Sequence, residues 1–314
     1  MRRLSWWGIL VGWWLAALAG AGAADVPKGF TISPAYQMVN VPATGDADFS
    51  IGLTNHTSKD QNFRLSAQDF GSLDDTGGVA FLGAPASELE HKYGLASWLV
   101  LGKDALFVPA GASVQVPVSV ENRQSLAPGG HYGAVLVTAV DDFGQPIQDP
   151  RVGLKQVLTS LVLAVKEGGL VRQLRMTGQD TDAGWGRLPK EVQQHFANDG
   201  NVHLVPRGVT EVKDAFGWTV ERGALNEASA VILPESYRRY KTPLTAINKA
   251  LWPGRYRVVT TFRYDGTDQT KVFATTFWYA GALVVWALGI LVLAAAAGLV
   301  WWLWFRPHRK RRKK

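Results

Sequence analysis

The chain of 314 residues contains no cysteine. Disulfide bonds, metal sites built on thiolates and a cysteine nucleophile are therefore excluded. The sequence also has no G-x-S-x-G, H-E-x-x-H, P-loop or EF-hand pattern, which several enzyme and ion-binding classes require. We expect a protein without cofactor, metal or catalytic residue, held together by its apolar cores.

Excess charge is scarce outside the two ends of the chain. The net charge of +7 comes from 33 basic and 26 acidic residues. Nine of the basic residues lie at the extreme N- and C-termini, which leaves 24 basic against 26 acidic residues elsewhere. Because nucleic-acid binding depends on clustered cations, we expect no nucleic-acid partner.

A long uncharged segment lies near the C-terminus, where no charged residue or histidine occurs between Lys271 and Arg306. Its twenty-residue centre, 281–300, would span about 30 Å as a helix, roughly the thickness of a hydrocarbon core. We interpret residues 278–305 as a transmembrane helix rather than a buried core helix. The aromatic residues that flank the centre, as in membrane-interface belts, are Trp278, Tyr279, Trp301, Trp302 and Trp304.

The last nine residues, 306–314, are strongly basic. By the positive-inside rule this tail is cytoplasmic, and the residues before the helix lie outside. The tail contains the cations Arg306, Arg309, Lys310, Arg311, Arg312, Lys313 and Lys314.

The first 24 residues have the layout of a secretory signal peptide. Two arginines precede an apolar run over 4–18, and Ala21-Gly22-Ala23 fits an A-x-A cleavage pattern. We predict cleavage near residue 24. The alternative is an uncleaved second membrane span, for which the apolar run is short.

Between these segments the chain alternates apolar and polar residues with a period of two, as in strands with one buried face. The runs 49–53 and 114–120 show this pattern clearly. We predict an all-β fold of two tandem Ig-like β-sandwich domains, 25–167 and 168–277. The junction is placed at Gly168-Gly169, which can supply a hinge.

A Pro-Gly pair shortly before a tyrosine opens one long predicted strand in each domain. In Ig-like sandwiches a tyrosine at the start of the penultimate strand bonds back to the backbone at the adjoining corner. We therefore interpret Tyr132 and Tyr256 as two structural corners. The alternative is that this motif is only a common way to open a strand.

The six histidines are scattered, and His195 and His203 come closest to a pair. Asp199-Gly200 predicts a two-residue hairpin turn. In that hairpin Phe196 pairs with His203, so the two imidazoles would point to opposite faces. This arrangement disfavours a zinc site.

Acidic pairs and tryptophans complete the candidate residues. Asp74-Asp75 and Asp141-Asp142 lie in Gly-containing segments, where aspartate ordinarily forms turns rather than an acid–base pair or a calcium site. We expect Trp98 and Trp218 to be core residues. Trp185 lies between two glycines in a predicted loop and is the candidate for an exposed ligand contact.

Several segments resemble the WxL-interacting cell-surface proteins of Gram-positive-type bacteria. FTISPAYQ, FSIGLTNHTSKDQNFRLSAQDF, ASWLVLG and PAGASVQVPVSVENRQSLAPGGHYGAVLV are similar to the first domain of that family. FANDGNVHLVPRGVTEVKDAFG, VILPESYRRY and PGRYRV are similar to the domain that follows. The resemblance implies two Ig-like domains on the cell-wall side of a bacterial plasma membrane. It links the first domain to peptidoglycan and the second to host or partner proteins.

These observations predict a non-catalytic, membrane-anchored surface protein that binds cell-wall polymer or partner surface proteins, with a role in adhesion or scaffolding. Free strand edges would offer partners main-chain hydrogen bonds. An alternative is a chaperone-like accessory factor for secretion or assembly of surface structures, because tandem Ig-like domains also resemble pilus chaperones. An envelope hydrolase is a third alternative, which would need a convergent acid–base pair.

Overall fold

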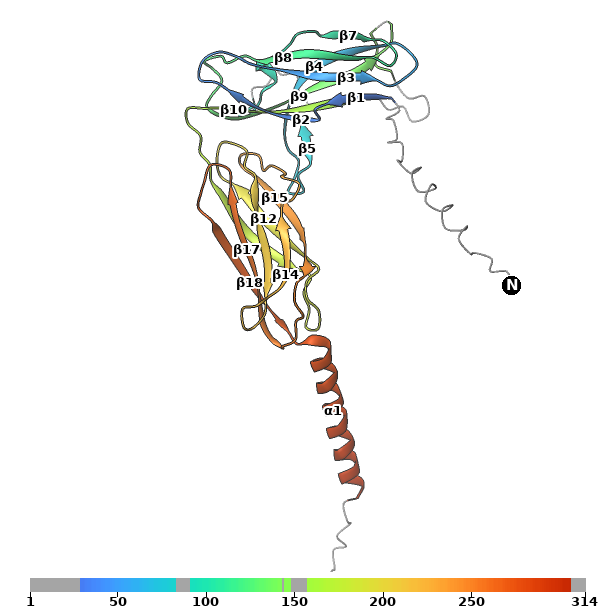
Figure 1. The fold of residues 1–314 in the computed structure, drawn as a ribbon, viewed down its shortest axis with the longest axis vertical. Coiled ribbons are helices and arrows are strands. Elements are labelled where there is room, and N and C mark those ends of the chain that lie inside the picture. The colour runs from blue at the N-terminus through green and yellow to red at the C-terminus, as the bar shows by residue number, and fades with distance from the viewer. Residues whose placement is uncertain (1–28, 83–90, 143, 148–156, 306–314) are drawn as a thin grey trace, which may run out of the picture.

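The computed structural model describes residues 29–82, 91–142, 144–147 and 157–305 (Figure 1). The predicted signal peptide and the basic tail lie outside these residues. Apart from the short 3-10 helix Ala96–Trp98, the regular structure described before residue 280 is β, and one α-helix, α1 (Gly281–Trp304), follows. The predictions of a mostly β fold and of one apolar C-terminal helix are confirmed.

The strands before residue 167 form two sheets, which we call the N-terminal unit. The sheets have the orders β1-β3-β8-β6 and β2-β10-β9-β4-β5, with β7 paired to β4 in the second. The chain crosses from the first sheet to the second between β1 and β2, at a cis Ser33–Pro34 peptide bond. The strands are β1 (Phe30–Ser33), β2 (Tyr36–Val41), β3 (Ala47–Asn55), β4 (Gln61–Ser72), β5 (Val79–Phe81), β6 (Leu99–Leu101), β7 (Ala105–Val108), β8 (Ser113–Val120), β9 (Gly129–Val140) and β10 (Val157–Lys166).

Alternating apolar residues of both sheets meet in one core. Ile51 of β3 and Val116 of β8 come from the four-stranded sheet, and Phe63 of β4 and Val137 of β9 from the six-stranded sheet. All four side chains are buried. The period-two pattern predicted from the sequence therefore marks the inner faces of two packed sheets.

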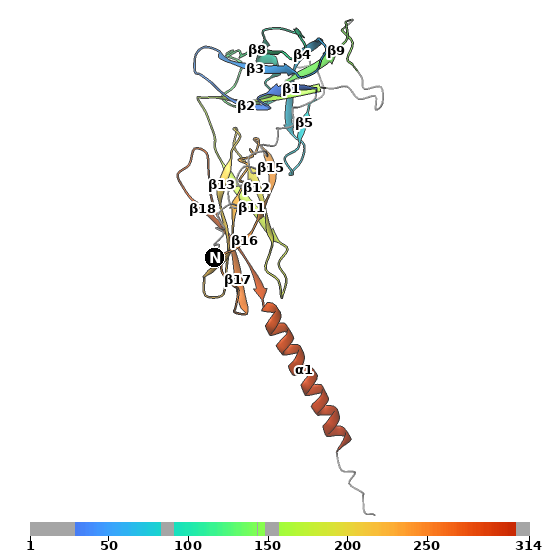
Figure 2. The same ribbon diagram turned by 45° about the vertical axis from the view of Figure 1, so that its right-hand side comes forward.

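The strands from residue 174 onward form two further sheets, which we call the C-terminal unit. Their orders are β11-β12-β15 and β16-β14-β13-β17-β18. The strands are β11 (Leu174–Thr181), β12 (Glu191–Asn198), β13 (Pro206–Lys213), β14 (Thr219–Leu225), β15 (Ser236–Pro243), β16 (Thr245–Ala246), β17 (Gly254–Tyr264) and β18 (Lys271–Tyr279). Figures 1 and 2 show this unit between the N-terminal unit and α1.

The predicted Asp199-Gly200 hairpin is wrong. β12 pairs with β11 and β15, whereas the next strand, β13, belongs to the other sheet. The Asn198 amide donates to the carbonyls of Val202 and Ile232 at 2.8 and 3.0 Å and accepts from the Gly200 N–H at 3.0 Å. These bonds hold residues 198–202 as a loop that passes between the sheets, and after it Leu204 pairs with Ile232 rather than with β12.

The two tyrosines expected at corners behave differently. The hydroxyl of buried Tyr256 donates to the carbonyl of Trp252, four residues upstream, at 2.7 Å. The hydroxyl of Tyr132 instead contacts His203 of the C-terminal unit. Tyr132 therefore links the two units rather than closing a corner within its own sheets.

The helix α1 follows β18 after a single residue, Ala280. The segment Trp286–Trp304 is long and apolar enough to cross a membrane, and none of it is buried against the described protein. A core helix would be buried, so this exposure argues against the alternative of a core helix. Trp278 and Tyr279 lie on β18, where they pair with Arg255 and Gly254, and not on the helix.

A chain of hydrogen-bonded polar side chains crosses the interior of the C-terminal unit. The Gln194 amide lies 2.9 Å from the Thr210 hydroxyl and 3.0 Å from the Thr242 hydroxyl. Thr210 contacts the hydroxyl of Thr260 at 3.0 Å, and Thr260 donates to Gln179. All five are buried and lie between the apolar clusters around Phe196 and Val258.

We expect Thr210→Val to lower the free energy of unfolding by about 1–3 kcal/mol, because the buried partners Gln194 and Thr260 lose a hydrogen bond that water cannot replace. Chemical denaturation of the full chain in detergent measures this change. The matched control is Thr261→Val on β17, whose hydroxyl makes no hydrogen bond within the described part of the chain. Equal effects of the two substitutions would contradict a stabilising role for the polar chain.

Candidate functional site

Strand β10 is apolar on both faces and lies at the centre of the candidate site. Val162 and Ala164 point into the core of the N-terminal unit. Leu161 and Leu163 point to the opposite side of the sheet, where they join a cluster with Val231 and other residues of both units. A run of apolar residues without alternation is expected for a strand covered on both faces. The outer face of the six-stranded sheet is thus an interface between the units.

Polar contacts join the units around this apolar face. The N–H of Gly130 donates to the carbonyl of Asn201 at 2.8 Å. At the tip of the β4–β5 hairpin, the carbonyl of Asp75 accepts from the N–H of Arg239 at 2.6 Å, and their side chains form an ion pair at 3.4 Å. Figure 1 shows β5 reaching from the N-terminal unit toward β15. Near the same face, the exposed ion pair of Lys92 and Glu235 adds a further contact.

The Tyr132–His203 contact lies at the centre of this interface. The Tyr132 hydroxyl accepts from the backbone N–H of His203 at 2.8 Å and lies 3.2 Å from its Nδ1. Burial lowers the pKa of His203 to about 4, and burial also raises the pKa of Tyr132. Both side chains are therefore neutral near pH 7, and a neutral Nδ1 can accept the tyrosine proton.

The interface does not close completely. It leaves a cavity of about 280 Å³, which we call the groove. Arg238 supplies the one charged side chain among its lining residues, and the Arg238 guanidinium donates to the carbonyl of Val231 at 2.6 Å. The larger apolar side chains in the lining are Tyr36, Phe70, Val79, Leu161, Leu163, Val231, Ile232, Leu233 and Tyr237.

An unpaired strand edge leads into the groove. β2 is the end strand of its sheet and pairs in parallel with β10, with no second neighbour in the described part of the chain. The carbonyl of Ala35 accepts from the N–H of Leu161, so alternation directs the main-chain groups of Tyr36 and Met38 away from β10. These two side chains are 56% and 49% exposed, and Tyr36 also lines the groove.

The sequence-predicted contact residue Trp185 lies elsewhere. Its side chain is 76% exposed, in the loop between β11 and β12, and its carbonyl accepts from the N–H of Ala280 at 2.7 Å. Trp98 packs against the core as expected. Trp218 does not, because it is 71% exposed in the turn before β14, so the prediction of a core role is wrong. Trp301, Trp302 and Trp304 are exposed at the end of α1.

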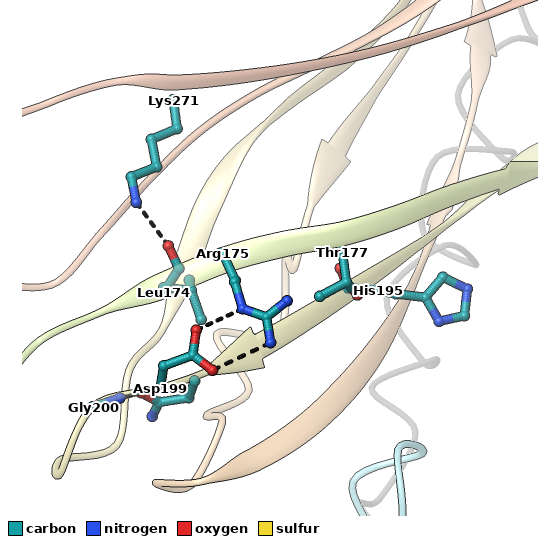
Figure 3. Close-up of polar contacts among 8 residues, drawn as sticks. Leu174, Arg175, Thr177, His195, Asp199, Gly200 and Lys271 are labelled. Carbon is teal, nitrogen blue, oxygen red and sulfur yellow. Dashed lines mark hydrogen bonds and ion pairs between the residues drawn. The ribbon is translucent and has the colours of Figure 1, made fainter.

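Three of the polar candidates, Asp74, Asp75 and His195, line one pocket of about 460 Å³, but each of them bonds to a different partner and not to another candidate. His195 pairs with Asp180 at the surface, and Figure 3 shows its ring pointing away from the Arg175–Asp199 ion pair. No group of three metal-ligand side chains occurs within the described ranges. Asp74 accepts from the N–H and hydroxyl of Thr76, and Asp141 accepts from the N–H of Gln145. Both are turn contacts, as predicted.

One perturbed carboxyl group has no counterpart in the sequence predictions. Burial, together with the charge of Asp182, raises the pKa of Glu221 to about 7. Its Oε2 is buried without a hydrogen-bond partner within the described residues. Glu221 lies on β14 and does not line the groove. Only long-range pairing sets its environment, so no local signal could have identified it.

Comparisons with known proteins return solved structures only. No family model matches the chain, and no curated protein matches it. The class 5 fimbrial chaperone CfaA is similar at 14% identity and a TM-score of 0.44, over 79% of this chain and 99% of that chain. The E. coli chaperone DraB is similar at 12% identity and a TM-score of 0.38, over 78% and 96% of the two chains. Similarity at this level assigns no function, and the resemblance to WxL-interacting proteins stays a prediction.

We expect His203 to make the protein acid-sensitive. The pKa of His203 is about 4 in the folded protein against an ordinary 6.5, so as the pH falls the unfolded chain binds the proton first. The stability due to neutral His203 is complete above pH 6.5 and is lost between pH 6.5 and 4, on the order of 3 kcal/mol.

Denaturation of the full chain at pH 7 and pH 4.5, with and without His203→Gln, measures this contribution. The substitution should reduce the difference in unfolding free energy between the two pH values. His195→Gln is the matched control, because His195 lies in the surface pair with Asp180. An unchanged pH difference in His203→Gln would show that the buried imidazole is not responsible.

Proposed function

We propose that this chain is a non-catalytic, membrane-anchored protein of chaperone-like function, which holds an extended segment of another polypeptide. The observation that carries the proposal is the position of the unpaired β2 edge beside the apolar groove. An extended segment added to β2 would gain main-chain hydrogen bonds, and its apolar side chains would enter the groove. Such binding needs no fixed sequence, because the backbone supplies much of the recognition.

The chemistry of the groove favours a polypeptide over a cell-wall polymer. Its larger lining side chains are apolar, and Arg238 is the one charged group among the lining residues. A glycan presents many hydroxyls that need polar partners, whereas in this lining the apolar side chains outnumber the polar ones, which include Ser72, Ser229 and Ser236. A surface protein in transit is therefore the partner that we propose, and peptidoglycan binding stays a prediction from the resemblance.

The proposed location of the protein rests on α1. We infer that this helix spans the plasma membrane of a bacterium, that the basic tail is cytoplasmic, and that both β units face the cell-wall side. Each unit is proposed to be one Ig-like β-sandwich domain. This arrangement would place the groove outside the cell, where surface proteins emerge and have not yet assembled.

We expect Met38→Pro to weaken peptide binding about tenfold, because proline removes the main-chain donor that points away from β10. The substitution is compatible with an edge strand, where this N–H has no partner in the sheet. Met38→Ala is the matched control, since it shortens the side chain and keeps the N–H. The detergent-solubilised full chain is titrated against nine-residue peptides that alternate valine or leucine with threonine.

Two outcomes would contradict the proposal. One is equal binding by Met38→Pro and the unsubstituted chain, which would exclude strand addition at β2. The other is retention of the protein on isolated peptidoglycan together with no affinity for any alternating peptide, which would favour the cell-wall role.

A further inference from the structure

Five exposed aromatic side chains of the C-terminal unit gather at one end. Trp185, Phe216, Trp218, Trp252 and Trp278 are 57% to 76% exposed, and we call them the aromatic collar. Three of the loops between strands, 182–190, 214–218 and 247–253, carry the first four residues, and Trp278 lies at the end of β18. A protein surface that contacts only water rarely carries so many large aromatic side chains in one place.

The hydrogen bonds and the strand register place this collar level with the start of α1. The carbonyl of Trp185 accepts from the N–H of Ala280, the residue before the helix. The first residue of β17, Gly254, pairs with Tyr279, so the loop that carries Trp252 also ends beside the helix. The ring centroids of Trp252 and Phe216 are 6.3 Å apart. Figures 1 and 2 show α1 leaving the unit among these loops.

The opposite end of the same unit differs. The loops 199–205, 226–235 and 265–270 carry no exposed large apolar or aromatic side chain. Asp265 and Asp268 lie in the last of them. Among these loops, exposed aromatic side chains therefore occur only at the end from which the apolar helix emerges. At the other end Tyr237, the second residue of β15, is exposed, and it lines the groove.

We propose that the aromatic collar is a lipid-contact surface, which lies in the headgroup layer of the membrane that α1 crosses. Tryptophan is enriched at this depth because its ring is apolar and its N–H can still bond to water or headgroups. With one residue between β18 and α1, the collar cannot lie far from the bilayer once the helix is inserted. The proposal rests on the proposed membrane anchoring, and it adds a second contact that holds the unit upright.

The absence of cysteine makes the test direct, because a single cysteine can be introduced and spin-labelled anywhere in the full chain. The chain is reconstituted in liposomes of phosphatidylcholine and phosphatidylglycerol. Collar positions are Trp185→Cys, Phe216→Cys and Trp252→Cys. Asp268→Cys reports the opposite end of the unit, and Leu293→Cys reports the helix. The measurement is the ratio of accessibility to oxygen, which dissolves in lipid, over accessibility to a water-soluble nickel chelate.

We expect the collar labels to show a ratio at least about threefold above that of Asp268→Cys, and below that of Leu293→Cys, as for groups at headgroup depth. If Leu293→Cys is lipid-exposed while the collar labels match Asp268→Cys, the collar proposal fails and the anchoring stands. If Leu293→Cys is water-exposed, both fail. Collar labels shielded from both reagents would indicate a protein partner there and would also overturn lipid contact.

A second variant tests the consequence for orientation. Trp185, Phe216 and Trp252 are replaced together by serine or, as the conservative control, by tyrosine. Because these side chains are exposed, folding should be preserved. Energy transfer from a dye at Asp268→Cys to acceptors in the bilayer measures the distance of that end of the unit from the lipid. With serine this distance should become shorter and its distribution broader. With tyrosine both should return to the values found with the original aromatic residues. An unchanged distance with serine would show that the collar does not orient the unit.

Discussion

The arrangement of the whole molecule depends on one apolar surface, the outer face of the six-stranded sheet. Since β10 has apolar side chains on both faces, the face away from the core needs a cover. Val231 and Leu233 of the C-terminal unit provide it. The Tyr132–His203 contact and the Asp75–Arg239 contact then set the direction in which the second unit extends. The interface between the units is thus as much a product of hydrophobic burial as either core.

The same surface accounts for the candidate binding site. The cover leaves the groove unfilled, and Tyr36 on the edge strand and Phe70 on β4 are among the residues of the sheet that line it. An edge strand without a neighbour invites pairing with another chain, which many proteins prevent with charge or proline. On β2 the exposed side chains at the edge include Tyr36 and Met38, which are neither charged nor proline. An edge left open in this way is consistent with a protein that receives strands from others.

The two proposed contacts lie at opposite ends of the C-terminal unit. The groove is bounded by the start of β15, and the aromatic collar surrounds the start of α1. The eleven residues of β17 run between these ends and span about 35 Å. If the collar holds the unit upright, a bound segment is kept at about that height above the lipid, clear of the membrane surface.

The sequence alone determined the properties that short-range patterns encode. Alternation at residues such as Ile51 and Val116 predicted the strands and their buried faces, and the uncharged segment after Lys271 predicted the helix, because both depend only on nearby residues. The partners of those strands were decided by the tertiary structure. Asp199-Gly200 has the local chemistry of a hairpin turn, yet Asn198 bonds across to Val202 and Ile232 and sends the chain to the other sheet. The contact of Tyr132, the exposure of Trp218 and the groove were also decided by the tertiary structure, because burial or exposure of a side chain depends on which distant segment covers it.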